Sequence, residues 1–455
     1  MNRRFVNRIS LSVVLLLLPL GTYATDTPAT GLSLREAVDT ALGENPVSAS
    51  AAAGQETAHA RLLQARTMWL PEIQLTENFV RSDNPVFVFG SLLEQGRFGP
   101  QHFDPAFLNN PDYLRNYRTN LNIRYPIFDQ LRRFTMNQQA AIGVKAADAQ
   151  SDGIRQQLRF QTIRAYYGVL VAEAGKNVAD DAVQMAQAMV ERVRNSYETG
   201  LVVESDYLAA QTQLADFQQK QIQANGNLRI AQQALAAALG EPTAIVRPLS
   251  GTLVDREFTI ADTPELVKTA LADRADARGV RYGERVSELG IRAAAGQFLP
   301  RLDGFATIGA SGIDPTTSGR DTMVGAMVTL NVFEPARLGR LAEAKAARKM
   351  ATAERRRTED QIRLEVIQAV EGFLTARQSI VVASHAVDQA ADALRIVQDR
   401  YGEGLTTITE VLRAETANVQ AEMNLLASRN DLYTGYARVL LATGQLKDVT
   451  PFESE

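Results

Sequence analysis

Hydrophobic residues recur every three or four positions over two long stretches of this chain, as in helices that pack on close neighbours. The first stretch keeps an unbroken four-three spacing through Val203, Tyr207, Ala210, Leu214, Phe217, Gln221, Ala224, Leu228, Ala231, Leu235 and Ala238. A weaker series has Val411, Ala414, Ala421, Leu425, Leu432 and Val439 and is interrupted by Asn418, Ser428 and Gly435. Both predict helices with a narrow packing seam, although periodicity alone also fits a plain soluble coiled coil.

The spacing of proline predicts how far these helices extend. No proline lies between Pro126 and Pro242, or between Pro335 and Pro451, and each gap holds 115 residues rich in good helix formers. A proline inside a helix costs about 3 kcal/mol, so long helices avoid it. Glycine interrupts the gaps near residues 200 and 404, which predicts a long helix, a tip and a returning helix in each. Roughly sixty helical residues before each tip would span about 90 Å.

A second pattern, with period two, predicts four strands. The clearest strand runs from Tyr117 to Ile127 and alternates apolar with polar side chains. Its polar face carries Arg118, Asn120, Asn122 and Arg124. Residues 321–333 repeat the pattern with a softer contrast, and residues 70–80 and 302–312 are weaker still. We therefore expect hairpins within 70–127 and 300–333, the second with a short turn at 314–320.

Four strands are too few to close a barrel, because even small barrels need about eight. A strand of about ten residues crosses a bilayer when tilted, but free sheet edges are not tolerated in lipid. Closure would therefore require other chains, with eight, twelve or sixteen strands from two, three or four copies. The alternative, a water-facing sheet packed on the helices, stays open from the pattern alone.

The chain also contains an internal duplication. EAVDTALGENP from Glu36 matches ELVKTALADRA from Glu265, and YETGLVVESDYLAAQ from Tyr197 matches YGEGLTTITEVLRAE from Tyr401. Between these, residues 69–71 match 298–300 and residues 125–128 match 330–333, in the same order. The offset falls from 229 to 205, so the first copy has about 24 extra residues before Pro126. We expect a first repeat over 25–245 and a second over 246–455.

Residues 1–24 read as a secretory signal. Three arginines precede an apolar core of about twelve residues and a small-x-small cleavage site at 22–24, too short for a membrane anchor. Removing them leaves 45 basic and 52 acidic side chains, a balance that argues against nucleic-acid binding. The chain has no cysteine, which excludes thiolate metal sites, disulfides and a lipidated N-terminal cysteine.

Together these features resemble the TolC family of outer-membrane efflux proteins. The most specific part is the bend motif, with Tyr197, Gly200, Leu201, Asp206, Leu208, Ala210 and Gln211 echoed by Tyr401, Gly404, Leu405, Glu410, Leu412 and Ala414. The resemblance implies a mainly α fold and a homotrimer, with four strands per chain in a twelve-stranded transmembrane β-barrel. This barrel would continue into a long periplasmic α-helical barrel. It also implies a periplasmic adaptor and an inner-membrane transporter as partners, and outer-membrane lipid around the strands.

The resemblance further implies a periplasmic gate at the tips, formed by Tyr197, Gly200, Asp206, Tyr401, Gly404, Glu410 and Arg413. Thr406 stands where the best-known member has arginine, and Arg413 where it has aspartate. This exchange suggests a tether between Arg413 and Asp206 and argues against a purely acidic, cation-selective ring. Two simpler interpretations stay open: the glycines only form turns, and Asp206 and Glu410 only favour helix N-termini.

The long loop of the first copy, residues 81–116, carries five phenylalanines and four prolines. Long loops tend to be functional, so a plug or lid at the cell surface is one interpretation. The simpler one, which we favour here, is that the aromatic side chains pack the loop upon itself.

The sequence offers no catalytic, cofactor or metal site. It has no Walker lysine motif, no GxGxxG opening a helix and no histidine pair at metal spacing among His59, His102 and His385. We therefore predict no enzyme but an exit channel of a tripartite efflux system in the outer membrane. The conduit of a type I protein secretion system and a soluble periplasmic coiled-coil protein are the alternatives.

Overall fold

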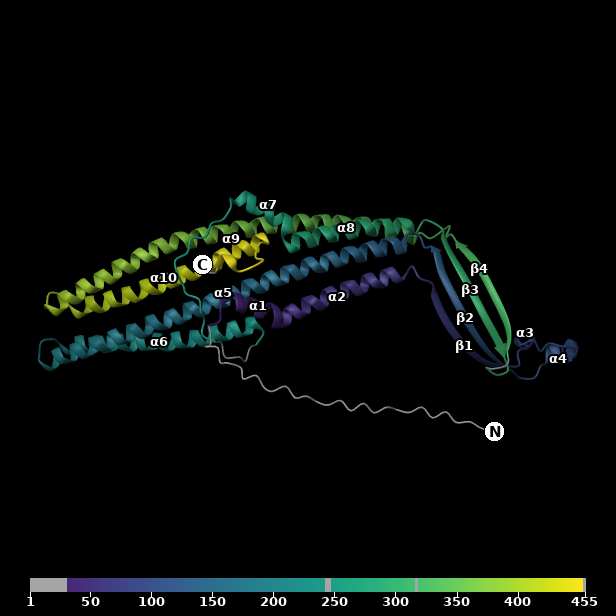
Figure 1. Ribbon diagram of the computed structural model, residues 1–455, viewed down its shortest axis with the longest axis horizontal. Helices are drawn as coiled ribbons and strands as arrows, with labels where there is room; N and C mark the ends of the chain where they lie inside the picture. The colour runs from purple at the N-terminus through teal and green to yellow at the C-terminus, as the bar shows by residue number, and fades with distance from the viewer. Residues whose placement is uncertain (1–30, 242–246, 316–317, 453–455) are drawn as a thin grey trace, which may run out of the picture.

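Long helices and a four-stranded sheet are joined end to end in this protein (Figure 1). The computed structural model describes residues 31–241, 247–315 and 318–452. The helices run side by side along most of the molecule, the sheet follows at one end, and two short helices lie beyond the sheet. The signal predicted over residues 1–24 lies outside the described residues.

The helices come in pairs of equal length. The first half contains α1 (Leu34–Glu44), α2 (Pro46–Thr67), α5 (Arg132–Glu198) and α6 (Glu204–Leu239). The second half contains α7 (Thr263–Asp273), α8 (Ala275–Gly296), α9 (Ala336–Gly402) and α10 (Ile408–Thr443). The pairs have 11, 22, 67 and 36 residues respectively. A helix of 67 residues spans about 100 Å, which confirms the predicted long helix, tip and returning helix.

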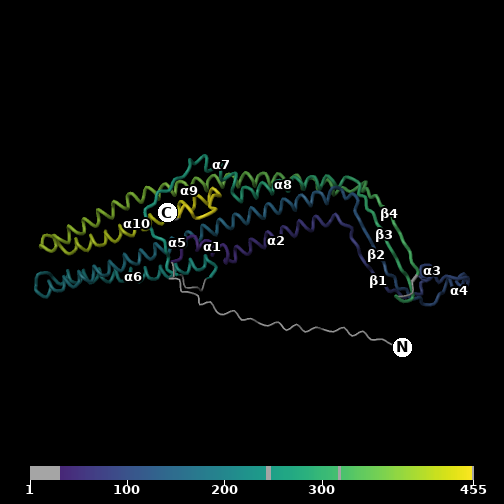
Figure 2. Tube along the Cα trace, in the orientation of Figure 1, coloured from purple at the N-terminus to yellow at the C-terminus, as the bar shows by residue number. Residues whose placement is uncertain are grey.

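The sheet contains β1 (Glu72–Ser82), β2 (Leu114–Phe128), β3 (Arg301–Gly312) and β4 (Ser318–Thr329), all antiparallel and in that order. The two halves of the chain therefore meet at the β2–β3 pair, where Tyr117 lies opposite Gly312 and Tyr125 opposite Gly304. Within the described chain, β1 and β4 each have a single neighbour and form the two edges. Figure 2 follows this path along the backbone.

The prediction for the fourth strand was wrong in its boundaries. The strand begins three residues earlier than predicted, at Ser318, and ends at Thr329 instead of residue 333, and the preceding turn is correspondingly shorter. After it, the Asn331 side-chain amide donates to Glu334 Oε2 at 3.2 Å, and Glu334 is paired with Arg337 and Arg340. These local side-chain bonds compete with strand pairing and lead the chain into α9.

The same arginine contact anchors the junction between sheet and helices in both halves. Arg133 is buried, pairs with Asp129 at 3.2 Å, and lies over the Trp69 ring at 4.5 Å. In the second half, buried Arg337 lies over the ring of Phe298 at 5.7 Å. Each strand pair is thereby fixed to the start of the long helix that follows it.

The main core lies midway along the helices, where α1, α5, α7, α9 and α10 meet. Tyr167 stacks on Tyr433 with ring centroids 4.3 Å apart, and the Tyr166 hydroxyl donates to the Leu32 carbonyl at 3.0 Å. Two smaller apolar clusters continue from this core toward the tips. In α6 every position of the predicted seam from Tyr207 to Ala238 is buried or half-buried, whereas Val203, just before the helix, is exposed. Ala236 and Leu239 are buried in addition to the seam.

Candidate duct lining and helical tips

The two tips have the same backbone geometry. Gly200 and Gly404 both have a φ of +74°, a left-handed conformation that glycine adopts without steric cost. At each turn the glycine N–H donates to the tyrosine carbonyl three residues earlier, from Gly200 to Tyr197 at 2.9 Å and from Gly404 to Tyr401 at 3.0 Å. The bend motif is therefore a helix C-cap in both halves, which accounts for its glycine and its spacing.

The acids that follow each tip do not cap the returning helices by side-chain hydrogen bonds. Val203 and Thr407 occupy the N-cap positions of α6 and α10, and neither helix has a side-chain cap. Asp206 and Glu410 lie in the first turn, where their charge favours the positive helix end.

The tip residues form contacts within one chain, but the proposed tether does not form there. Arg413 Nη1 pairs with Glu410 Oε1 at 3.1 Å on the same helix, instead of with Asp206. Burial, followed by the negative charge of Asp206, raises the pKa of Tyr401, and the positive charge of Arg192 offsets part of this rise. The rings of Tyr197 and Tyr207 stack at 5.9 Å. A pair between Arg413 and Asp206 of neighbouring chains stays a prediction.

One residue near the tips was missed by the sequence analysis. Glu415 in α10 is 1% exposed, and neither of its carboxylate oxygens has a hydrogen-bond partner among the described residues. Burial raises the pKa of this carboxyl, and Gln398 and Arg192 offset the rise in part. Its counterpart in the first half, Gln211, is exposed and bonds the Tyr207 hydroxyl at 2.8 Å. The only feature of the sequence that could have pointed to Glu415 is that the second copy has an acid where the first copy has Gln211.

The two faces of the sheet differ in polarity. Leu75 is 70% exposed and Val324 83% exposed on one face, which also carries Ile73, Phe79, Ile308 and Val328. The ionisable exceptions on this face are Glu77, Arg81, Arg115 and Arg320, and Glu77 accepts a hydrogen bond from Thr119. The opposite face carries the four polar residues predicted for β2, of which Arg118 bonds Asn120 at 3.1 Å and Asn122 accepts from Thr307 at 3.1 Å.

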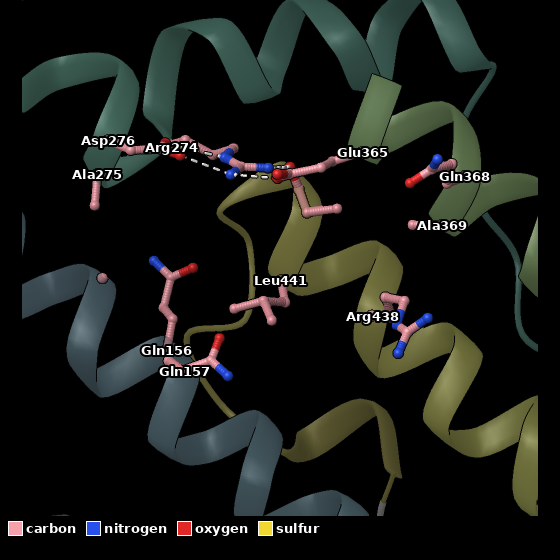
Figure 3. Close-up of a pocket in the computed structure, with 12 residues that line it drawn as sticks. Gln156, Gln157, Arg274, Ala275, Asp276, Glu365, Gln368, Ala369, Arg438 and Leu441 are labelled. Carbon is pink, nitrogen blue, oxygen red and sulfur yellow. Dashed lines mark hydrogen bonds and ion pairs between the residues drawn. The ribbon is translucent and has the colours of Figure 1, made fainter. Parts of the chain in front are cut away.

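A cavity of about 440 Å³ with both charged and apolar residues in its lining lies where α5, α8, α9 and α10 meet (Figure 3). Arg274 lies at its edge and pairs with Asp276 and Glu365, each at 2.7 Å, and it donates to the Ala442 carbonyl at 3.1 Å. These bonds tie the start of α8 to α9 and to the end of α10. Among the described residues no cluster of His, Asp or Glu is suited to a metal ion, and no helix is long and apolar enough to cross a membrane.

A sequence model of outer membrane efflux proteins matches residues 37–241 and 266–445, which is most of this chain. The chain belongs to the outer membrane efflux protein family. This membership places it among the outer-membrane channels that extend into the periplasm. The two matched segments contain both pairs of long helices and all four strands of the sheet.

Several known proteins are similar to the chain at low identity. The alkaline protease secretion protein AprF of Pseudomonas aeruginosa is 23% identical over 363 residues, covering 75% of this chain and 72% of AprF. The fusaric acid resistance protein FusA of Burkholderia cepacia is 24% identical over 64% of this chain and 55% of FusA. The crystal structure of the Campylobacter jejuni CmeC outer membrane channel superposes with a TM-score of 0.80 at 18% identity, covering 96% of this chain and 95% of CmeC. These similarities confirm the predicted mainly α fold with a four-stranded sheet in each chain, and the trimeric barrel stays a prediction.

Proposed function

We propose that three copies of this chain close into one continuous passive duct, with a twelve-stranded barrel in the outer membrane and an α-helical barrel across the periplasm. The observation that carries the proposal is the sheet itself. It has two unpaired edges, one apolar and exposed face, and one polar face. A sheet of this kind is stable in lipid only when its edges pair with other copies and its apolar face meets acyl chains.

Membership of the efflux family supports three copies over two or four, and it supports coupling to a periplasmic adaptor and an inner-membrane transporter. The polar residues of β2, from Arg118 to Arg124, would then line the duct. The duct would be passive, because the energy for export would come from the inner-membrane partner. We therefore propose no catalytic role for any residue of the described chain.

The assembly is tested on the purified full-length protein in detergent and on fractionated cells. We expect the mass of a trimer by light scattering, recovery in the outer-membrane fraction, and stepwise conductance after insertion into planar bilayers. A monomer in the soluble periplasmic fraction would reject the proposal.

We further propose that the tips form the periplasmic gate. Within one chain the charge of Asp206 acts on Tyr401, and the exposed Glu410–Arg413 pair lies in the first turns of the other returning helix. In bilayers, Asp206→Ala and Arg413→Ala are expected to raise the open probability. The matched control is Arg395→Ala, which removes an exposed arginine of α9 that pairs with Asp392 at 3.3 Å. Unchanged conductance in both tip variants would leave these residues as helix-end charges only.

A second function, export of a protein through a type I secretion system, is favoured by the similarity to AprF, whose name refers to protease secretion. Deletion of the gene distinguishes efflux of small molecules from secretion of a protein. Small-molecule efflux predicts increased sensitivity to some members of a panel of toxic compounds and metals, with unchanged secreted proteins. Protein secretion predicts the loss of a secreted protein with unchanged sensitivity.

A further inference from the structure

The helix α3 (Pro85–Glu94) in the long loop of the first half packs on the polar face of the sheet. The Glu94 carboxylate forms an ion pair with Arg118, and the Ser311 hydroxyl donates to it at 3.3 Å. Arg118 also pairs with Asp321 at 3.4 Å, so one guanidinium is shared by an acid from α3 and an acid from β4. Ser311 lies beneath this contact and is fully buried.

The end of α3 also approaches the sheet backbone closely. A methyl group added at Gly319 would lie 2.2 Å from the Glu94 carbonyl oxygen, so only glycine allows this approach. Gln95 is buried, and its amide donates to the Arg115 carbonyl at 3.0 Å and to Asn116 Oδ1 at 2.9 Å. Three strands therefore hold the end of α3 through charges, side-chain hydrogen bonds and tight backbone packing.

The rest of the loop is folded around its own aromatic side chains. Phe98 contacts the rings of Phe89 at 4.8 Å and Phe103 at 5.1 Å, and His102 contacts Phe107 at 5.0 Å. The His102 ring nitrogen Nδ1 also accepts the Gly99 N–H at 2.9 Å. The helix is thus held at its C-terminal end by the sheet and at its middle, through Phe89, by a compact aromatic cluster.

We propose that α3 forms a size-selective filter at the outer mouth of the duct, held on the duct-facing side by Arg118 between Glu94 and Asp321. The proposal rests on the proposed function, since the polar face of the sheet lines a channel only in the closed barrel. Three copies of α3 would then project over the opening at the cell surface. Small solutes would pass freely, whereas a large solute would pass only when α3 leaves its contact with Gly319 and Arg118.

The absence of cysteine from the chain allows a direct test in intact cells. Met327 lies on the polar face, is 53% exposed, and is separated from α3 by more than half the length of β4. Met327→Cys is labelled from outside with a small charged maleimide and with a long polyethylene-glycol maleimide. We expect labelling by the small reagent and slow labelling by the long one.

Two second substitutions then release α3, each combined with Met327→Cys. Glu94→Gln removes the ion pair, and Gly319→Ala introduces a steric clash without changing any charge. Over-packing of this kind disfavours a docked state by enough to raise the rate of labelling with the long reagent on the order of tenfold. The matched control is Gly90→Ala, which adds the same methyl group to α3 where no atom lies within 4 Å, and which leaves the rate unchanged.

The outcomes separate this inference from the proposed function. Equal labelling by the long reagent in the parent, Gly319→Ala and Glu94→Gln backgrounds would overturn the filter, whether labelling is fast or absent in all of them. Val324→Cys, on the apolar face, reports on the barrel itself, because lipid shields this position from charged maleimides. Rapid labelling of Val324→Cys in cells would instead reject the barrel.

Discussion

Glu415 is a single acidic side chain buried between the two apolar clusters near the tips, with Met189, Val193 and Val411 in one and Phe217 and Val419 in the other. Arg192 and Gln398 are the polar groups from α5 and α9 that act on it. Burial of this carboxylate outweighs the partial compensation from these two groups, so the folded protein holds the proton to a higher pH than the unfolded chain does. The two helical hairpins are therefore packed around a group whose charge depends on pH.

This leads to a prediction for Glu415→Gln. The folded-state pKa is raised, so the stability that comes from the neutral acid is fully present below the unfolded value of 4.5. This contribution to stability is lost as the pH rises through the pKa of Glu415 in the folded protein. The apparent melting temperature of the wild type should therefore fall more steeply from about pH 5 to about pH 8 than that of Glu415→Gln.

The control is Glu371→Gln, at an exposed position of α9, which should keep the wild-type dependence on pH. Equal pH profiles for Glu415→Gln and the wild type would show that the hairpins accommodate the charged form. Near neutral pH the variant should be the more stable protein, because the glutamine amide cannot ionise and its burial never places a charge between the helices.

Single residues also show where sequence reasoning reaches its limit. The turns at Gly200 and Gly404 were predictable because glycine has a local reason to occupy a left-handed position. The partner of Arg413 was not, since a long side chain reaches acids on its own helix and on others. The burial of Glu415 depends on how two hairpins dock, and no pattern within α10 alone contains that information.

At the junction between α8 and α5 the backbone of one element lies tightly against that of the other. Gln130 and Leu131 have positive φ values of 61° and 67°, and a methyl group at Gly296 would lie 2.1 Å from the Gln130 carbonyl oxygen. Gly296→Ala is therefore expected to destabilise the protein by about 1–3 kcal/mol, because backbone atoms must move. The measurement is the apparent melting temperature of the assembled protein in detergent.

The matched variant is Gly290→Ala, two turns earlier in the same helix, where no atom lies within 4 Å. Replacing glycine by alanine inside a helix stabilises it by about 0.5–1 kcal/mol, so this variant should melt at the same or a higher temperature. A similar loss in both variants would point to a general effect of changing α8 and not to the tight junction.

Helices and strands were predicted best where their sequence pattern extends over many residues. The proline-free gaps give α5, α6, α9 and α10 directly, and alternation gives β2. The fourth strand was placed too late, because Leu330 and Val332 continue the alternation while Glu334 already bonds to α9 residues. The helix α3 was treated as loop, although Asn84 and Pro85 carry a start signal, and the Asn84 side chain accepts the Phe87 N–H at 3.1 Å.

For the whole molecule, the decisive question is what pairs with the two edge strands. Closure by three copies predicts that β1 of one chain lies beside β4 of the next, with their polar faces on the same side. In a chain without cysteine, Thr76→Cys on β1 can be combined in turn with Met323→Cys, Met327→Cys or Thr329→Cys on β4. All four positions lie on the polar face. A disulfide requires Cβ atoms about 3.5–4.5 Å apart, so the pair in register should be oxidised.

That pair should give covalent dimers and trimers on a denaturing gel, with the trimer as the largest species because three links close the ring. The control pair is Asn122→Cys with Thr307→Cys, which lie opposite each other on β2 and β3 of one chain. Their disulfide must leave the mobility of a monomer. A ladder that stops at dimers or continues to tetramers would exclude three copies, and no intermolecular product across the series would exclude closure through these edges. The stoichiometry is thus read from the same sheet edges that first required more than one chain.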